Sequence, residues 1–217
     1  MTALGERRAE LLSLEFSVHS FPGYYIAVEG TGATGKETIS LTLQDRIRHM
    51  FPEVPSDLVV VTREPGGSPK AERMRAALKV SKYWPVKAQI DGFNQARDDS
   101  LNVAVAPVLE QGGVVISDRN FAATCAYQGA AGGYGVEQVL ARSKPVIGRF
   151  IPNCFVCIER DLTVALEQAR QRDLTGEHDS FDQAGLRFNL AVQGGYRRLR
   201  ELLRCVTGFG LTIKTGN

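Results

Sequence analysis

Short apolar runs alternate with longer amphipathic stretches along this chain of 217 residues. The runs are rich in Val, Ile and Phe, and each ends at a polar or charged residue. Residues 38–50 have the periodicity of an amphipathic helix. This alternation predicts an α/β fold with a five-stranded parallel sheet flanked by helices. The predicted strands are residues 24–29, 58–62, 113–118, 153–159 and 210–214.

The ends of three predicted strands carry most of the polar residues that suit a binding site. In parallel α/β folds, ligands bind beyond the carboxyl ends of the strands. Here those ends carry Glu29 with a glycine-rich loop, the segment Thr62-Arg-Glu-Pro-Gly-Gly67, and Asp118-Arg119. We therefore expect the functional site at this edge of the sheet.

The glycine-rich loop has the pattern of a phosphate-binding loop. It reads Gly30-Thr-Gly-Ala-Thr-Gly35-Lys36 between a predicted strand and a predicted helix, the context that makes this motif specific. Glycines let main-chain N–H groups surround phosphate oxygens at the positive end of the helix. The next residue is Glu37, where the motif has a hydroxyl that binds Mg²⁺. The residues predicted to hold the phosphates of a nucleotide are Gly30, Thr31, Gly32, Ala33, Thr34, Gly35, Lys36, Glu37 and Thr38.

Composition and charge restrict the remaining possibilities. The length fits a single α/β domain over residues 1–217, and the formal net charge of +2 comes from mixed acidic and basic residues. No basic tract marks a nucleic-acid surface, and no apolar run approaches 18 residues. The N-terminal residues make a poor signal peptide because Glu15 interrupts the apolar stretch. We expect a cytoplasmic protein that binds neither nucleic acid nor membranes.

Cys154 and Cys157 have the spacing of redox and zinc motifs but lie in a predicted strand. Residues three apart on a strand point to opposite faces, so the two thiols are predicted to be buried core residues. Cys125, Cys205 and the three histidines show no ligand spacing.

Arg63 and two pairs of residues suit nucleotide chemistry. Arg63 beside a Pro-Gly-Gly turn fits a bidentate phosphate contact, and Asp118-Arg119 offers a carboxylate for Mg²⁺ and a cation for phosphate. Phe93 and Arg97 share one face of a predicted helix, where a ring and a guanidinium can hold a nucleobase. Taken alone, each pair also fits an ordinary ion pair or core packing; the phosphate loop favours the functional interpretation.

In these motifs the chain resembles the thymidylate kinases, which phosphorylate dTMP with ATP. The resemblance runs in order from about Tyr25 to Tyr196 and includes Val28-Glu-Gly30, Thr62-Arg-Glu-Pro-Gly-Gly67 and Phe93-x-x-x-Arg97. It continues with Asp118-Arg-Asn-Phe-Ala-Ala-Thr-Cys-Ala-Tyr-Gln-Gly129. The resemblance implies a three-layer fold of the P-loop nucleoside-monophosphate-kinase type, with an N-terminal extension (1–22) and a lid at about 170–183. It also implies a homodimer.

The resemblance implies a role for each matching residue. Phe93 would stack on thymine, Arg97 would bond its O4, and Tyr127 would favour a deoxyribose. Asp118, with Glu37 as a second candidate, would place the Mg²⁺ that accompanies ATP. The implied catalytic residues are Lys36, Arg119, Arg170 and Arg172, and the implied dTMP-binding residues are Arg63, Phe93, Arg97, Arg119, Thr124, Tyr127 and Gln128.

The chain departs from the family pattern on the catalytic side. Gly32 replaces an aspartate that touches the sugar, and Ala33, Glu37 and Ala123 replace a glycine, a Ser/Thr and a serine. In the lid, Ser180 stands where the family has an arginine. Three interpretations follow: a dTMP kinase of reduced activity, a nucleotide-binding protein without catalysis, and a kinase of a related or modified nucleotide. Gly32, Ala123 and Asn120 would mark the altered acceptor pocket of the third.

Overall fold

The computed structural model describes residues 20–32, 34–79, 81–164, 185–203 and 208–215. Its centre is a parallel sheet in the order β2-β3-β1-β4-β5, which confirms the predicted α/β class. The strands are β1 (Tyr24–Gly30), β2 (Val59–Arg63), β3 (Val114–Asp118), β4 (Cys154–Arg160) and β5 (Gly208–Thr215). The first four strands begin and end within one residue of their predicted bounds.

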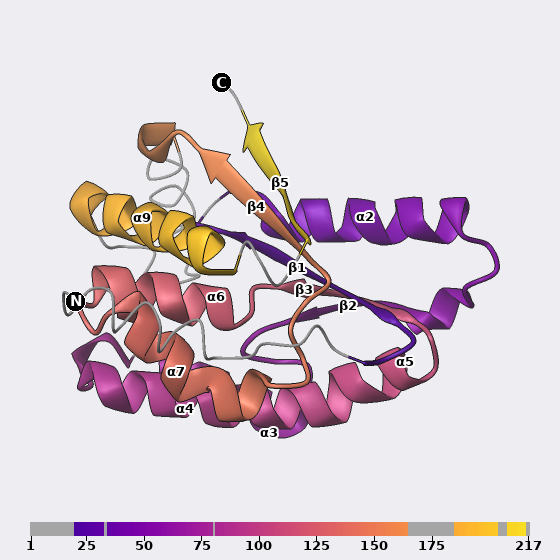
Figure 1. The fold of residues 1–217 in the computed structure, drawn as a ribbon, viewed down its shortest axis with the longest axis horizontal. Coiled ribbons are helices and arrows are strands. Elements are labelled where there is room, and N and C mark those ends of the chain that lie inside the picture. Colours follow the sequence, from indigo (N-terminus) through magenta and orange to yellow (C-terminus); the bar gives the residue numbers. More distant parts are fainter. Residues whose placement is uncertain (1–19, 33, 80, 165–184, 204–207, 216–217) are drawn as a thin grey trace, which may run out of the picture.

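The helices cover both faces of this sheet (Figure 1). Helix α2 (Lys36–Met50) lies on one face, and the others lie on the opposite face or at its edges. These are α3 (Pro69–Lys79), α4 (Val86–Ser100), α5 (Ala106–Glu110), α6 (Phe121–Thr124), α7 (Val136–Ile147) and α9 (Leu186–Leu203). Short helical turns complete the description: η1 (Ser56–Leu58), η2 (Ser81–Tyr83), η3 (Leu101–Val105) and η4 (Cys125–Ala131).

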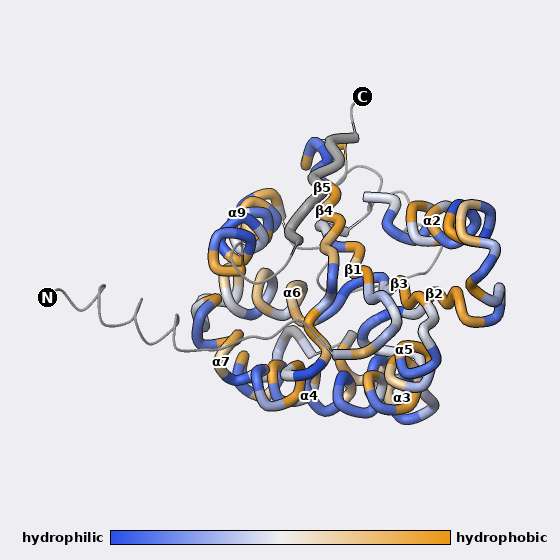
Figure 2. Tube along the Cα trace, turned by 45° about the vertical axis from the view of Figure 1, so that its right-hand side comes forward, coloured by the Kyte–Doolittle hydropathy of each residue, from blue (hydrophilic) through white to orange (hydrophobic). Residues whose placement is uncertain are grey.

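The alternation of side chains along the strands produces two apolar layers. On β1, Val28 packs with Ile116 and Val156 beneath α2, whereas Ala27 packs with Phe155 and the α6, α7 and α9 side chains. Figure 2 shows hydrophobic colour along these strands and alternating colour on the helices that cover them. The three-layer arrangement therefore follows directly from the period-two pattern of the strands.

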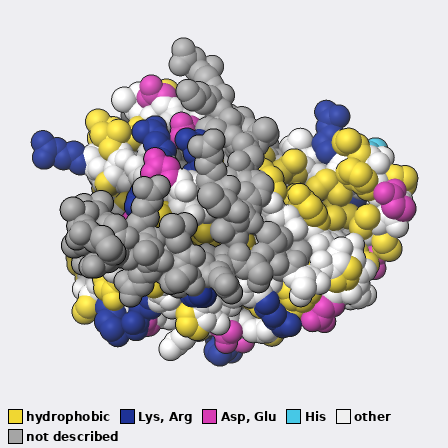
Figure 3. All heavy atoms as spheres, in the orientation of Figure 1, with side chains coloured by type: hydrophobic (Ala, Val, Ile, Leu, Met, Phe, Trp, Pro, Cys, Tyr) yellow, Lys and Arg dark blue, Asp and Glu magenta, His cyan; other side chains and the backbone are white. Residues whose placement is uncertain are grey.

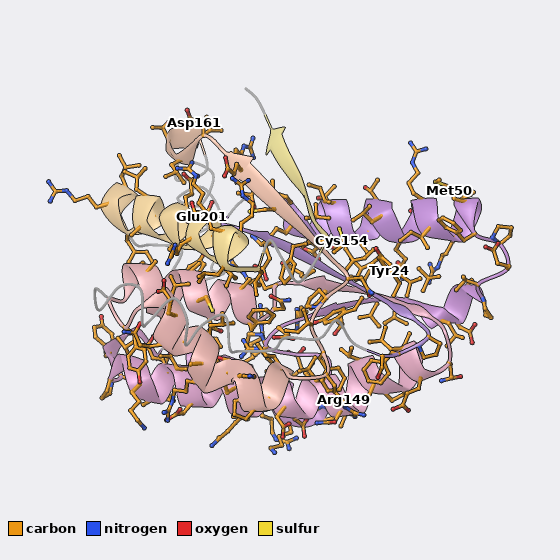
Figure 4. The ribbon with its side chains drawn as sticks, viewed as in Figure 1. Tyr24, Met50, Arg149, Cys154, Asp161 and Glu201 are labelled. Atoms are coloured by element: carbon orange, nitrogen blue, oxygen red, sulfur yellow. The ribbon has the colours of Figure 1, made fainter. Side chains whose placement is uncertain are left out.

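The predicted separation of Cys154 and Cys157 is confirmed. Cys154, labelled in Figure 4, packs with the apolar cluster beneath α2, and Cys157 packs with the cluster on the other face. Both are free thiols and only partly buried, rather than fully buried as predicted. Burial raises the pKa of both, and that of Cys157 reaches about 12.

Apolar side chains also reach the surface near α2. Leu41, Met50 and Phe51 are exposed, and Figure 3 shows hydrophobic side chains gathered over this helix. None of the helices in the described ranges is both long and apolar enough to cross a membrane.

Candidate nucleotide-binding site

The loop between β1 and α2 depends on two glycines. Gly30 has φ +150°, and a Cβ there would lie 2.6 Å from the carbonyl oxygen of Ile158 on β4. Gly35 has φ +81° and precedes α2 without a side-chain cap, with open space beside its Cα. The N–H groups of the first turn of α2 are therefore available to an anionic ligand.

Lys36 lies inside this loop. Its ammonium donates to the Thr31 carbonyl oxygen at 2.6 Å and to Thr34 Oγ1 at 3.3 Å, and the residue is 7% exposed. Thr31 Oγ1 is buried and has no hydrogen-bond partner in the described part of the chain, whereas the side chains of Glu37 and Thr38 are exposed. The fold thus brings the predicted ATP-binding residues together, except Ala33, which lies outside the described residues.

A cavity that is open to solvent lies at the carboxyl ends of β2 and β3. Its wall is built from the β2–α3 turn, α3, α4, the β3–α6 turn, α6 and η4. All seven predicted dTMP-binding residues line it, together with Asp118. The lining residues are Arg63, Glu64, Pro65, Arg75, Leu78, Phe93, Arg97, Asp118, Arg119, Asn120, Ala123, Thr124, Tyr127 and Gln128.

Arg97 is held rigidly at the inner end of this cavity. Its Nε donates to Glu64 at 2.7 Å, and its terminal nitrogens donate to Asn94 Oδ1 and Thr124 Oγ1 at 2.5 and 2.8 Å. Arg97 and Glu64 are both 3% exposed. Burial raises the pKa of Glu64, and the Arg97 charge opposes that rise. Phe93 lies one turn earlier on α4, so the cavity presents a ring beside a fixed guanidinium.

Arg63 lies at the outer end of the cavity in a surface ion pair. It donates from Nε and from a terminal nitrogen to the Glu72 carboxylate of α3, at 3.1 and 2.9 Å. A Cβ at Gly66 would lie 2.6 Å from that carboxylate, so the glycine turn makes room for the pair. Arg75, also on α3, donates to the Pro65 carbonyl oxygen and lines the cavity. Both guanidiniums are thus placed for an anionic group at the cavity mouth.

Arg119 connects the loop with the cavity. Its terminal nitrogens donate to the Gly30 carbonyl oxygen at 3.2 Å, to the Tyr127 hydroxyl at 3.2 Å and to the Tyr196 hydroxyl at 3.4 Å. The guanidinium carbon lies 4.9 Å from the centre of the Tyr127 ring. Arg119 also has φ +70°, a conformation that is costly for a residue with a side chain. Such strain is typical of functional sites.

Asp118 offers an oxygen that suits a cation. Its Oδ1 is buried and has no hydrogen-bond partner among the described residues. A buried carboxylate oxygen without a hydrogen bond can bind a hard divalent cation. Mg²⁺ usually takes one or two carboxylates plus phosphates and water. No group of three or more His, Cys, Asp or Glu side chains with metal-binding geometry occurs in the described ranges. The residues therefore fit a cation that is bound together with a nucleotide, rather than one that is coordinated by protein side chains alone.

Glu29, at the end of β1, is a buried carboxyl between the loop and α9. It accepts from the Asn120 main-chain N–H at 2.8 Å and from the Tyr196 hydroxyl at 2.9 Å, and it is 1% exposed. Desolvation raises its pKa from 4.5 to about 8, although the Arg119 charge and these hydrogen bonds oppose the rise. The Glu29 carboxyl is thus largely protonated in the folded protein near neutral pH.

This pKa predicts a specific dependence of stability on pH. Between about pH 4.5 and 8, folded Glu29 keeps a proton that the unfolded chain has released, so the free energy of unfolding falls as the pH rises. Glu29→Gln should remove this loss, which is on the order of a few kcal/mol. Urea denaturation at pH 5 and pH 8 would measure it. The exposed residue Glu53 gives the control Glu53→Gln; equal slopes for Glu29→Gln and the native chain would contradict the prediction.

Several contacts of the site were not predicted from the sequence. Glu64 lies in the Arg-Glu-Pro-Gly-Gly segment and Arg75 on the helix that follows it, but no role in the cavity was predicted for either residue. Asn120 caps α6 through its side-chain oxygen, and its buried Nδ2 has no partner among the described residues. Tyr196 marked only the end of the family resemblance. The predicted lid, with Arg170, Arg172 and Ser180, and residues 1–19 of the predicted extension lie outside the described residues.

Comparison with known protein families agrees with the motifs. The model of the thymidylate kinase family matches residues 28–205. A thymidylate kinase of Bradyrhizobium sp. (strain ORS 278) is 32% identical over 188 residues, which cover 85% of this chain and 81% of that protein. One from Teredinibacter turnerae is 35% identical over 181 residues, with 82% and 84% covered.

The fold has a similar counterpart among solved structures. The crystal structure of thymidylate kinase from Ehrlichia chaffeensis matches with a TM-score of 0.67 and 22% sequence identity, over 90% of this chain and 91% of that one. At this level of identity the likeness concerns the fold.

Proposed function

Because the chain belongs to the thymidylate kinase family, we propose that it transfers the terminal phosphoryl group of ATP to dTMP and forms dTDP and ADP. The observation that carries this proposal is the position of Arg119. Its guanidinium contacts both the Gly30 carbonyl oxygen of the phosphate loop and the Tyr127 hydroxyl of the cavity. The ATP site and the dTMP site therefore both adjoin the guanidinium of Arg119.

The cavity would hold dTMP with its base at the inner end. Phe93 stacks on the thymine ring, and Arg97 donates a hydrogen bond to O4. Thr124 keeps the guanidinium in place by accepting from it at 2.8 Å, and Gln128 lies beside the base. Tyr127 packs against the 2′ side of the sugar and favours a deoxyribose. The buried Glu64 keeps Arg97 from turning away while the site is empty.

Phosphoryl transfer depends on alignment and on neutralising charge, with little covalent chemistry supplied by the protein. The main-chain N–H groups of the loop and Lys36 hold the ATP phosphates. Arg63 and Arg75 hold the dTMP phosphate at the cavity mouth, and Arg119 lies between the two nucleotides. Arg170 and Arg172 are the lid candidates for a further positive charge during transfer.

Mg²⁺ bound with ATP would neutralise part of the charge on the transferred phosphate. Asp118 is the residue that would hold it, since its Oδ1 lacks another partner among the described residues. Glu37, in the first turn of α2, would be the second carboxylate. The hydrogen bonds with Glu72 are the main cause that raises the pKa of Arg63, and the charge of Glu37 adds a smaller contribution, so this charge reaches the acceptor side of the site.

The departures at Gly32, Ala33, Glu37 and Ser180 support an alternative for the same site. A negative charge beside the ATP phosphates opposes donor binding, whereas the base end of the cavity retains Phe93 and the fixed guanidinium. A nucleotide-binding protein without catalysis is therefore the second candidate function. A kinase of a related or modified nucleotide is the third, favoured by Ala123 in the cavity wall.

A coupled assay with dTMP, ATP and Mg²⁺ tests the proposal. We expect measurable turnover in the native chain and about tenfold more in Glu37→Thr, because threonine supplies the hydroxyl that the loop motif offers to Mg²⁺; a gain of ~1.4 kcal/mol corresponds to that factor. Asp45→Asn, an exposed carboxylate further along α2, is the matched control and should leave the rate unchanged. Deoxynucleoside monophosphates other than dTMP, assayed in parallel, identify the third candidate.

Calorimetry separates the remaining outcomes. If dTMP binds but neither the native chain nor Glu37→Thr turns over, the protein is a nucleotide-binding protein and the kinase proposal is wrong. If Phe93→Ala binds dTMP as tightly as the native chain, the assignment of the cavity is wrong. Equal ATP binding with Mg²⁺ and with EDTA would exclude Glu37 as a metal ligand.

The oligomeric state in this proposal rests on family membership, and the location rests on the sequence. We expect a homodimer, which light scattering would measure, and a cytoplasmic location. We also treat residues 1–217 as one domain.

A further inference from the structure

Two amide side chains form a chain of hydrogen bonds behind the cavity wall. Gln128 of η4 lines the cavity, and its Nε2 donates to Oε1 of Gln89 at 3.0 Å. Gln89 lies on α4, and its own Nε2 donates to the main-chain oxygen of Trp84 at 2.9 Å. Gln89 is 5% exposed and Gln128 is 3% exposed. The chain therefore runs from the cavity to a main-chain group through buried side chains.

The main-chain oxygen of Trp84 fixes the direction of donation along this series of hydrogen bonds. A carbonyl oxygen only accepts hydrogen bonds, so the nitrogen of Gln89 faces Trp84 and its oxygen faces Gln128. The nitrogen of Gln128 must then face Gln89. If Gln128 turned its amide over, two carbonyl oxygens would face each other in a buried place, at a cost of about 1–3 kcal/mol for each group left unsatisfied. The orientation of the Gln128 amide is thus set outside the cavity.

The other end of the Gln128 amide is its carbonyl oxygen. No donor within the described ranges contacts this oxygen, and it is not one of the fully buried side-chain atoms that lack a partner. It is therefore accessible, and the cavity is the space that Gln128 lines. The cavity wall presents an acceptor at this point, near the donating guanidinium of Arg97.

An acceptor beside a donor selects among pyrimidine bases. Thymine and uracil have a carbonyl oxygen at position 4 and an N–H at position 3, so they offer an acceptor beside a donor. Cytosine has the reverse, an amino group at position 4 and an unprotonated N3. A Gln128 oxygen accepts from the N3–H of thymine and repels N3 of cytosine, and a wrong pairing leaves buried polar groups unsatisfied.

We propose that Gln89 is a positioning residue that holds the Gln128 oxygen toward the base and thereby favours thymine over cytosine. This inference rests on the proposed dTMP site and adds to it a residue outside the cavity wall. Gln89 touches no substrate; it acts only through Gln128.

Binding of dTMP and dCMP to the full chain, measured by calorimetry, tests the inference without depending on turnover. Gln89→Met removes the acceptor that holds Gln128, so its amide can turn over. We expect the ratio of dTMP to dCMP affinity to fall about tenfold, with weaker dTMP binding and stronger dCMP binding. Gln89→Glu should keep the ratio near the native value when its carboxyl is protonated, because the O–H donates to the Trp84 oxygen and the other oxygen accepts from the Gln128 nitrogen.

The controls distinguish positioning from packing. Gln95→Met changes an exposed residue of the same helix and should alter neither affinity. A purely structural role of Gln89 would weaken both ligands equally and leave their ratio unchanged, which would overturn the inference. Gln89→Ala provides a second variant that lacks the contact if Gln89→Met does not fold. If the native chain itself binds dCMP as well as dTMP, the proposed dTMP site is wrong instead.

Discussion

Replacing Arg119 by Met should lower kcat/KM for dTMP by about 10³-fold or more. Removing an arginine that neutralises a transferring phosphoryl group has effects of roughly this size, about 4 kcal/mol of lost transition-state stabilisation. Arg119 has a second task, because it bonds the Gly30 carbonyl oxygen and the Tyr127 hydroxyl at 3.2 Å each. The variant therefore loses both a charge and the link between loop and cavity. Steady-state kinetics with each nucleotide varied in turn would measure the loss.

Two other variants identify what Arg119 contributes. Arg119→Lys keeps the charge but cannot reach two acceptors with one planar group, so it should recover only part of the rate. Arg198→Met is the control, since this exposed α9 arginine pairs with Glu137 of α7 and does not line the cavity. A native rate in Arg119→Met would contradict the proposed place of the reaction. If only the KM for dTMP rose and kcat stayed at the native value, Arg119 would bind the acceptor phosphate without acting in the transfer step.

Replacing Glu64 by Leu should lower the free energy of unfolding by ~3–5 kcal/mol. Arg97 and Glu64 are each 3% exposed and 2.7 Å apart, so removing the carboxylate leaves a guanidinium buried without its counter-charge. The matched control is Glu72→Leu, which breaks the ion pair between Arg63 and Glu72. The distance in this pair is similar, but the two side chains are 54% and 38% exposed. That exposed pair should contribute about 0–1 kcal/mol. Urea denaturation of both variants would measure the difference.

The double variant Glu64→Leu with Arg97→Leu tests the reason for the buried pair. Two apolar side chains in place of a buried ion pair are often as stable as the pair itself. We expect the double variant to recover most of the stability that Glu64→Leu loses, while dTMP binding stays lost with the guanidinium. If the single and double variants are equally unstable, the destabilisation comes from lost packing and not from an unpaired charge.

The sequence predicted the parts of this fold that depend on neighbouring residues. The strands follow a period of two, and the phosphate loop needs only glycines between a strand and a helix. Phe93 and Arg97 are four residues apart on one helix, so their common face was predictable. The order and type of these motifs also sufficed to place the predicted dTMP-binding residues around one cavity.

Contacts between distant residues could not be predicted in this way. Glu64 and Arg97 are 33 residues apart, and Glu29 and Tyr196 are 167 apart. A single sequence does not show which distant residues form a pair, because it does not distinguish a buried glutamate from an exposed one. The positive φ of Arg119 is equally hidden, since no glycine marks that position. Packing of α9 and α4 against the strand ends decides these contacts.

The alignment of the strands sets the spacing of the whole site. Asp118 is paired with Val28 of β1 on one side and with Arg63 of β2 on the other. A residue inserted into β3 would turn Asp118 to the opposite face of the sheet and separate it from both neighbours. Substitutions within this strand change single contacts, whereas insertions would disconnect the loop from the cavity. Changes in chain length should therefore be tolerated best in exposed connections such as residues 51–53, part of the segment that joins α2 to η1.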